Sequence, residues 1–126
     1  MINFSGRIAE NLPDAPIAIL LSGDLGVGKT EFARSFIRAK LGQPDLVVPS
    51  PTFTIVQHYG TSPGIAHFDL YRIKSTAELE EIGFFDALQN DIVLIEWPER
   101  AEGFLPKDAM RINIEMDGDG RIITAS

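Results

Sequence analysis

Residues 17–30 read IAILLSGDLGVGKT, and this stretch predicts the fold. The unbroken apolar run at residues 17–21 is typical of a strand buried on both faces of a parallel sheet. A glycine-rich segment follows directly, after which Phe32, Phe36 and Leu41 recur at helical spacing and Gly42 stands where a helix C-cap is expected. The order of strand, glycine-rich loop and helix predicts an α/β fold.

The glycine-rich segment matches the pattern G-x-x-x-x-G-K-[ST] in full. Glycines let successive backbone N–H groups point into one concavity, and the following helix adds its positive N-terminal end, so the loop suits a polyphosphate. Lys29 is expected to reach the β- and γ-phosphates, and Thr30 to ligate Mg²⁺. The expected nucleotide-binding residues of this loop are Gly23, Asp24, Leu25, Gly26, Val27, Gly28, Lys29 and Thr30.

Two acidic residues are candidates for the rest of the site. Glu96 ends an apolar strand predicted at residues 92–95, where a doubly wound sheet places its ligands, so it is expected to complete the Mg²⁺ shell. Its alternative is an ordinary exposed acid. Asp69 shares one polar face of a strand predicted at residues 66–72 with His67, the opposite face being packed. Asp69 could position the attacking water, reach the Mg²⁺ shell, or simply pair with Arg72.

Lys29, Asp69 and Glu96 are therefore the candidate catalytic residues, whereas His67 is expected to be structural. Thr52 follows a proline in a segment that could act as a switch sensing the γ-phosphate. Trp97 either lines the site or packs in the core. No N-K-x-D sequence occurs, which favours ATP over GTP, and a D-x-x-G match at residues 117–120 reads as a turn.

The remaining elements follow from local patterns. Helices are expected at residues 5–12 and 75–88, the second interrupted at Gly83, and a strand at residues 52–59. Residues 109–116 and 121–124 are expected to form a C-terminal β-hairpin. The whole predicts a P-loop NTPase-like three-layer sandwich, in which a mostly parallel central sheet is flanked by helices.

Composition limits the possible functions. The 126 residues suit a single P-loop ATPase domain, residues 1–126, and 44% apolar with 23% charged residues suits a packed core. No apolar run is long enough for a membrane span and cysteine is absent, so a cytoplasmic location without membrane contact is expected. A net charge of −7 makes RNA contact indirect. Arg34, Arg38 and Lys40 form either a local basic patch or a solvated helical face.

Beyond the loop, four motifs follow in order: SPTFT at residues 50–54, HFDLYR at 67–72, EL before IG at 78–83, and LIEWPER at 94–100. Together with the P-loop they resemble the bacterial TsaE family, also called YjeE, over nearly the whole chain. The resemblance implies an ATPase required for threonylcarbamoylation of the adenosine beside the anticodon in tRNAs that read codons beginning with A. It also implies that ATP hydrolysis resets a complex with the TsaB and TsaD pair, tRNA being touched only indirectly.

The resemblance also implies residue roles. Lys29 and Thr30 hold phosphate and Mg²⁺, Glu96 completes the Mg²⁺ shell, Asp69 is required for hydrolysis, Thr52 belongs to a switch-like segment and Trp97 lies near the nucleotide. The sequence departs from the family at Glu31, where relatives often carry a hydroxyl that touches the α-phosphate, and a weaker affinity is expected. Relatives also often have a short segment before the first helix that helps to enclose the base, whereas this sequence begins almost at that helix.

Two other functions are compatible with a P-loop. A nucleotide-gated binding module would bind ATP tightly and hydrolyse it only incidentally. A small-molecule kinase would carry an arginine-rich lid, and no such segment is present in the sequence.

Overall fold

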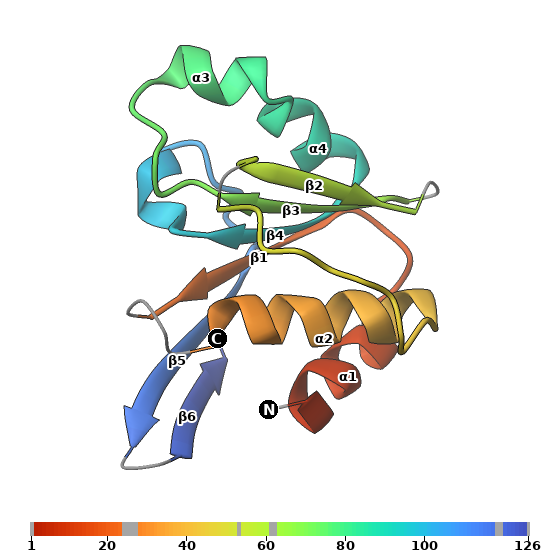
Figure 1. The fold of residues 1–126 in the computed structure, drawn as a ribbon. Coiled ribbons are helices and arrows are strands. Elements are labelled where there is room, and N and C mark those ends of the chain that lie inside the picture. The colour runs from red at the N-terminus through yellow and green to blue at the C-terminus, as the bar shows by residue number, and fades with distance from the viewer. Residues whose placement is uncertain (1, 24–27, 53, 61–62, 118–119, 126) are drawn as a thin grey trace.

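A computed structural model describes residues 2–23, 28–52, 54–60, 63–117 and 120–125. Its centre is a six-stranded sheet in the order β2-β3-β4-β1-β5-β6 (Figure 1). The inner strands β3, β4, β1 and β5 run parallel, while β2 and β6 pair antiparallel at the two edges. The strands are β1 (Ile17–Ser22), β2 (Val56–Tyr59), β3 (Ile65–Asp69), β4 (Ile92–Glu96), β5 (Met110–Asp117) and β6 (Gly120–Ala125).

Helices cover both faces of the sheet, giving three layers (Figure 1). Helices α1 (Ile2–Asn11) and α2 (Lys29–Leu41) lie on one face, and α3 (Thr76–Glu81) and α4 (Phe84–Asn90) on the other. Each face has its own apolar core, which includes Phe32 and Phe36 of α2 on one face and Phe68 and Phe84 on the other. The predicted mostly parallel α/β sandwich and its C-terminal hairpin are confirmed. None of the helices in the described part of the chain has the length and apolarity needed to cross a bilayer.

Glycines define the ends of the helices where the sequence indicated. Helix α2 is preceded by Gly28 at φ 100° and followed by Gly42 at φ 64°, both in the left-handed region. Gly42 donates its N–H to the carbonyls of Ala39 and Arg38, which satisfies groups at the helix end. The segment predicted as one interrupted helix at residues 75–88 forms two helices, because Gly83 adopts φ 76° between them.

The strands predicted at residues 52–59 and 66–72 are too long. Strand β2 starts at Val56, since residues 51–52 form a turn and Ile55 adopts a positive φ that no regular strand contains. Strand β3 starts one residue earlier, at Ile65, and ends at Asp69. The face predicted to be polar is also buried: every residue of β3 is buried, His67 completely.

The basic residues of α2 are partly buried and contact backbone carbonyls of neighbouring segments. Arg34 donates from Nε to the carbonyl of Val48 at 3.0 Å, and Arg38 does the same to Leu46 at 2.8 Å. Lys40 donates to the carbonyl of Leu12 at 2.7 Å, just after α1. These hydrogen bonds link the neighbouring segments to α2.

Two glycine-to-alanine substitutions are expected to have opposite effects on stability. Gly42→Ala should lower the free energy of unfolding by about 1–2 kcal/mol, because φ 64° is strained for a residue with Cβ. Gly6→Ala should raise it by about 0.5–1 kcal/mol, because Gly6 lies inside α1 and an added Cβ meets nothing within 4 Å. Urea denaturation measures both, and changes of the same sign would contradict this account.

Candidate functional site

The phosphate-binding loop lies between β1 and α2. Gly23 adopts φ 144° directly after β1, and the carbonyl of Gly28 accepts the first helical hydrogen bond, from the N–H of Phe32 at 2.9 Å. Both glycines therefore have backbone angles that favour glycine, as the motif predicted. Lys29 and Thr30 occupy the first turn of α2, where the positive end of the helix dipole favours an anion. Asp24, Leu25, Gly26 and Val27 lie outside the described residues.

The parallel pairing of β1, β4 and β3 gathers the acidic residues beside this loop. Glu96 is in register with Leu21 of β1 and with Asp69 of β3. Because parallel strands end at the same edge of the sheet, the last residues of β3 and β4 lie next to the start of the loop. Glu96 ends β4, as predicted, whereas Asp69, which was expected inside a strand at residues 66–72, is the last residue of β3.

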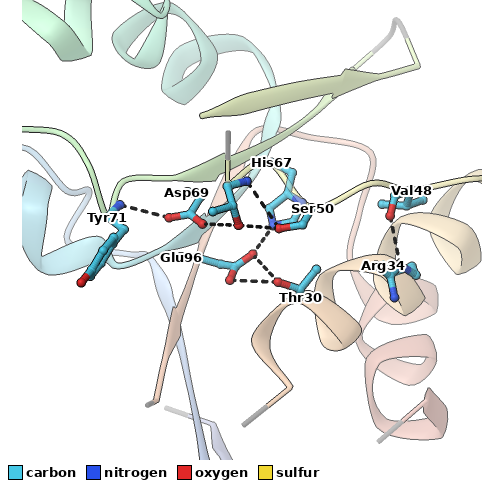
Figure 2. Close-up of polar contacts among 9 residues, drawn as sticks. Thr30, Arg34, Val48, Ser50, His67, Asp69, Tyr71 and Glu96 are labelled. Atoms are coloured by element: carbon cyan, nitrogen blue, oxygen red, sulfur yellow. Dashed lines mark hydrogen bonds and ion pairs between the residues drawn. The ribbon is translucent and has the colours of Figure 1, made fainter. Parts of the chain in front are cut away.

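Glu96 joins two elements of the site (Figure 2). The hydroxyl of Thr30 lies 3.2 Å from both carboxylate oxygens of Glu96, and Nε2 of His67 lies 2.7 Å from Oε2. The Glu96 residue is only 3% exposed, so it is not the ordinary exposed acid that the sequence left open. A buried carboxylate needs such partners, because burial without them is costly.

Asp69 contacts the segment that contains Thr52. Its Oδ2 accepts from the Thr52 hydroxyl at 3.2 Å, and its Oδ1 accepts from the backbone N–H of Tyr71 at 3.0 Å. The Ser50 and Thr52 hydroxyls are 2.7 Å apart, so Ser50 extends the chain of hydrogen bonds. Thr52 thus lies within hydrogen-bond distance of Asp69, and its contact with a γ-phosphate stays a prediction.

Trp97 lies against the lysine of the loop. The Nζ atom of Lys29 is 3.7 Å from the centroid of the Trp97 ring, within cation–π range. The same ring lies 4.9 Å from the ring of Tyr71 and packs against the core on the α4 side of the sheet. The ring therefore packs in the core, as one interpretation held, and it also contacts Lys29; a contact with nucleotide stays a prediction.

Backbone strain lies beside both acids. Ile55 at φ 72° and Trp97 at φ 59° are the non-glycine residues with positive φ in the described part of the chain. The carbonyl of Ile55 accepts from the N–H of Asp69 at 2.8 Å, and Trp97 directly follows Glu96. Bulky residues rarely adopt this conformation, and such strain is concentrated at functional sites.

His67 and Ser50 are residues whose contacts sequence reasoning missed. Alternation along the strand did place His67 on the face of Asp69, but no local pattern pairs it with Glu96, 29 residues away. Nδ1 of His67 is buried without a hydrogen-bond partner.

At the opposite end of the sheet, burial raises the pKa of Tyr59, and the charge of Arg34 opposes that shift.

The oxygen donors of the site fit Mg²⁺ shared with a nucleotide. The Thr30 hydroxyl and the Glu96 carboxylate are hard oxygen ligands that lie within hydrogen-bond distance of each other. Within the described residues, no group of three or more His, Cys, Asp or Glu side chains could hold a metal ion by itself. Mg²⁺ commonly uses one or two protein ligands and completes its shell with phosphates and water, which suits this donor set.

The fold and the site define a P-loop nucleotide-binding protein. In such a protein a glycine-bounded loop joins a parallel strand to a helix that begins with Lys-Thr, and an acid ends the adjacent strand. A family model described as "Threonylcarbamoyl adenosine biosynthesis protein TsaE" matches residues 1–123. The chain therefore belongs to the TsaE family of threonylcarbamoyladenosine biosynthesis proteins, as the sequence motifs indicated.

Individual relatives agree with the family assignment. The tRNA threonylcarbamoyladenosine biosynthesis protein TsaE of Rickettsia prowazekii is 40% identical over 122 residues, covering 95% of this chain and 83% of that protein. The Haemophilus influenzae protein of the same name is 39% identical, covering 98% and 80%. The crystal structure of YdiB from Bacillus subtilis superposes with a TM-score of 0.67 at 27% identity, covering 99% of this chain and 78% of that one.

The His67–Glu96 contact can be tested through stability. His67→Leu should lower the free energy of unfolding by about 1–3 kcal/mol, because the buried carboxylate loses a hydrogen-bond partner. His67→Gln retains an N–H donor and should recover part of that loss. Urea denaturation at fixed pH compares the variants. A leucine variant as stable as the parent would show that the contact contributes nothing.

Proposed function

We propose that the chain is an ATPase domain, residues 1–126, that hydrolyses ATP in threonylcarbamoyladenosine biosynthesis. One observation carries this proposal: Thr30, Thr52, Asp69 and Glu96, from four separate segments, form hydrogen-bonded pairs beside the start of α2. Such a cluster of polar groups, which includes the two buried carboxylates of Asp69 and Glu96, lies next to a lysine at a helix N-terminus and suits a bound triphosphate better than a packing role.

The loop residues Gly23 to Thr30 bind the phosphates of ATP in this proposal. Lys29, only 5% exposed, supplies a positive charge to the β- and γ-phosphates, and N–H groups at the start of α2 supply hydrogen bonds. Thr30 and Glu96 hold Mg²⁺, which neutralises charge on the phosphates. Thr52 senses the γ-phosphate and Trp97 lies next to the phosphate-binding lysine.

Hydrolysis requires water to attack the γ-phosphorus while the bond to the β-phosphate oxygen breaks, leaving ADP and phosphate. Asp69 ends β3, next to Glu96 at the end of β4, and its Oδ2 accepts a hydrogen bond from Thr52. A carboxylate at this place either orients the attacking water or supports the Mg²⁺ shell. Thr52 links its position to the switch-like segment, so movement of that segment would alter both groups together.

Action with the TsaB and TsaD pair is the remaining part of the proposal. The family is named for threonylcarbamoyladenosine biosynthesis, and its relatives are named tRNA threonylcarbamoyladenosine biosynthesis proteins, which supports this part of the proposal. This chain has a net charge of −7, and the basic side chains of α2 are engaged with backbone carbonyls. Such a surface is poorly suited to phosphate backbones, which supports indirect contact with tRNA through partner proteins.

Lys29→Ala should abolish ATP-dependent tRNA modification in a system reconstituted with TsaB and TsaD, because the phosphates lose their main counter-charge. Formation of the modified nucleoside is measured by mass spectrometry of digested tRNA. Lys74→Ala removes one positive charge at an exposed position outside the site and serves as the matched control. Full modification by the Lys29 variant would overturn the proposed role.

Asp69→Asn should lower ATP turnover by about 100-fold or more, because it keeps the shape of the side chain and removes its charge. Phosphate release and ATP affinity are measured at high and low Mg²⁺. Unchanged affinity with lost turnover assigns Asp69 to the water, while an affinity loss at low Mg²⁺ assigns it to the metal shell.

Turnover measured with and without the TsaB and TsaD pair separates the ATPase from a nucleotide-gated binding module. Stimulation by the pair is the expected result. Tight, nucleotide-dependent binding to the pair without turnover would show that the chain is a nucleotide-gated binding module and not an ATPase.

A further inference from the structure

The contact between Trp97 and Lys29 has a consequence for nucleotide binding. The ammonium of Lys29 lies 3.7 Å from the centroid of the Trp97 ring, and Lys29 is 5% exposed. A buried ammonium has lost most of its hydration, which makes an aromatic face a stronger partner than it would be in water. The ring therefore stabilises the charged end of Lys29 in the protein without nucleotide.

The backbone of the chain fixes this ring in place. Trp97 adopts φ 59° and ψ 53°, a strained conformation for a large side chain. It lies between Glu96, the last residue of β4, and Pro98, the buried first residue of the short 3₁₀ helix η1 (Pro98–Ala101). The ring of Tyr71, two residues after the end of β3, packs against the Trp97 ring with their centroids 4.9 Å apart. A strained backbone conformation that the surrounding packing maintains is typical of residues at functional sites.

We propose that Trp97 is a positioning residue that acts on the nucleotide through Lys29, by holding the ammonium ordered at the phosphate site before the triphosphate arrives. A lysine side chain has several rotatable bonds, and ordering it on binding would weaken affinity. Because the ring already orders the Lys29 side chain in the folded protein, this entropy is lost on folding and not on nucleotide binding. The inference rests on the proposed function in one respect, namely that Lys29 binds phosphate.

A positioning role differs from stacking on the base in what it predicts. If Trp97 acts through Lys29, its loss weakens every ligand that carries the polyphosphate, whatever the base. If Trp97 stacks on adenine, its loss weakens ATP and leaves inorganic tripolyphosphate unaffected. Because Trp97 is the only tryptophan in the sequence, its fluorescence also reports the lysine contact without any ligand.

The experiment measures affinity for ATP and for tripolyphosphate by calorimetry with Mg²⁺ present. Trp97→Leu should weaken both ligands equally, by about 3- to 30-fold, and Trp97→Phe should weaken both less, since it keeps a smaller aromatic face. Phe104→Leu removes an exposed aromatic residue outside the site and should change neither affinity. Thermal unfolding of each variant verifies that it is folded.

A second measurement needs no substitution at Trp97. Lys29→Met should shift the tryptophan emission of the ligand-free protein, because the cation over the ring is replaced by a neutral side chain. A weakening confined to ATP, unchanged affinities in Trp97→Leu, or unchanged emission in Lys29→Met would each overturn the inference. A parent protein that binds neither ligand would overturn the proposed function instead, so the two failures are distinguishable.

Discussion

The parallel pairing of β1, β4 and β3 is the constraint on which the site depends. It sets Glu96 in register with both Leu21 and Asp69, so the loop after β1 and the two acids share one edge of the sheet. Thr30 then reaches Glu96 from the first turn of α2, across 66 positions of the sequence. A shift of one residue in this pairing would turn the side chain of Glu96 to the opposite face.

The two buried acids have different partners, which gives them separable tasks. Glu96 is held by Thr30 and His67, all three belonging to regular elements of the sheet and α2. Asp69 is held partly by Thr52, in a segment without regular structure. One carboxylate is thus held by regular elements alone, while the other also contacts a segment outside the helices and strands.

That segment is anchored on both sides of Thr52. Before it, Arg34 holds the carbonyl of Val48, and Val48 itself is buried. After it, the carbonyl of Ile55 accepts from Asp69 at a strained backbone position. Helix α2, which begins at the P-loop, therefore also holds the segment before Thr52, so the positions of both depend on how α2 packs on the sheet.

Local sequence patterns determined the loop, the helix that follows it and the placement of Asp69 and Glu96 on strands, because periodicity and glycine positions act over a few residues. The tertiary structure decided which strands are neighbours, that β2 is antiparallel and short, and that His67 pairs with Glu96. It also turned Arg34 and Arg38 toward backbone carbonyls. These contacts join residues far apart in the chain, and their free energies depend on packing that no local pattern encodes.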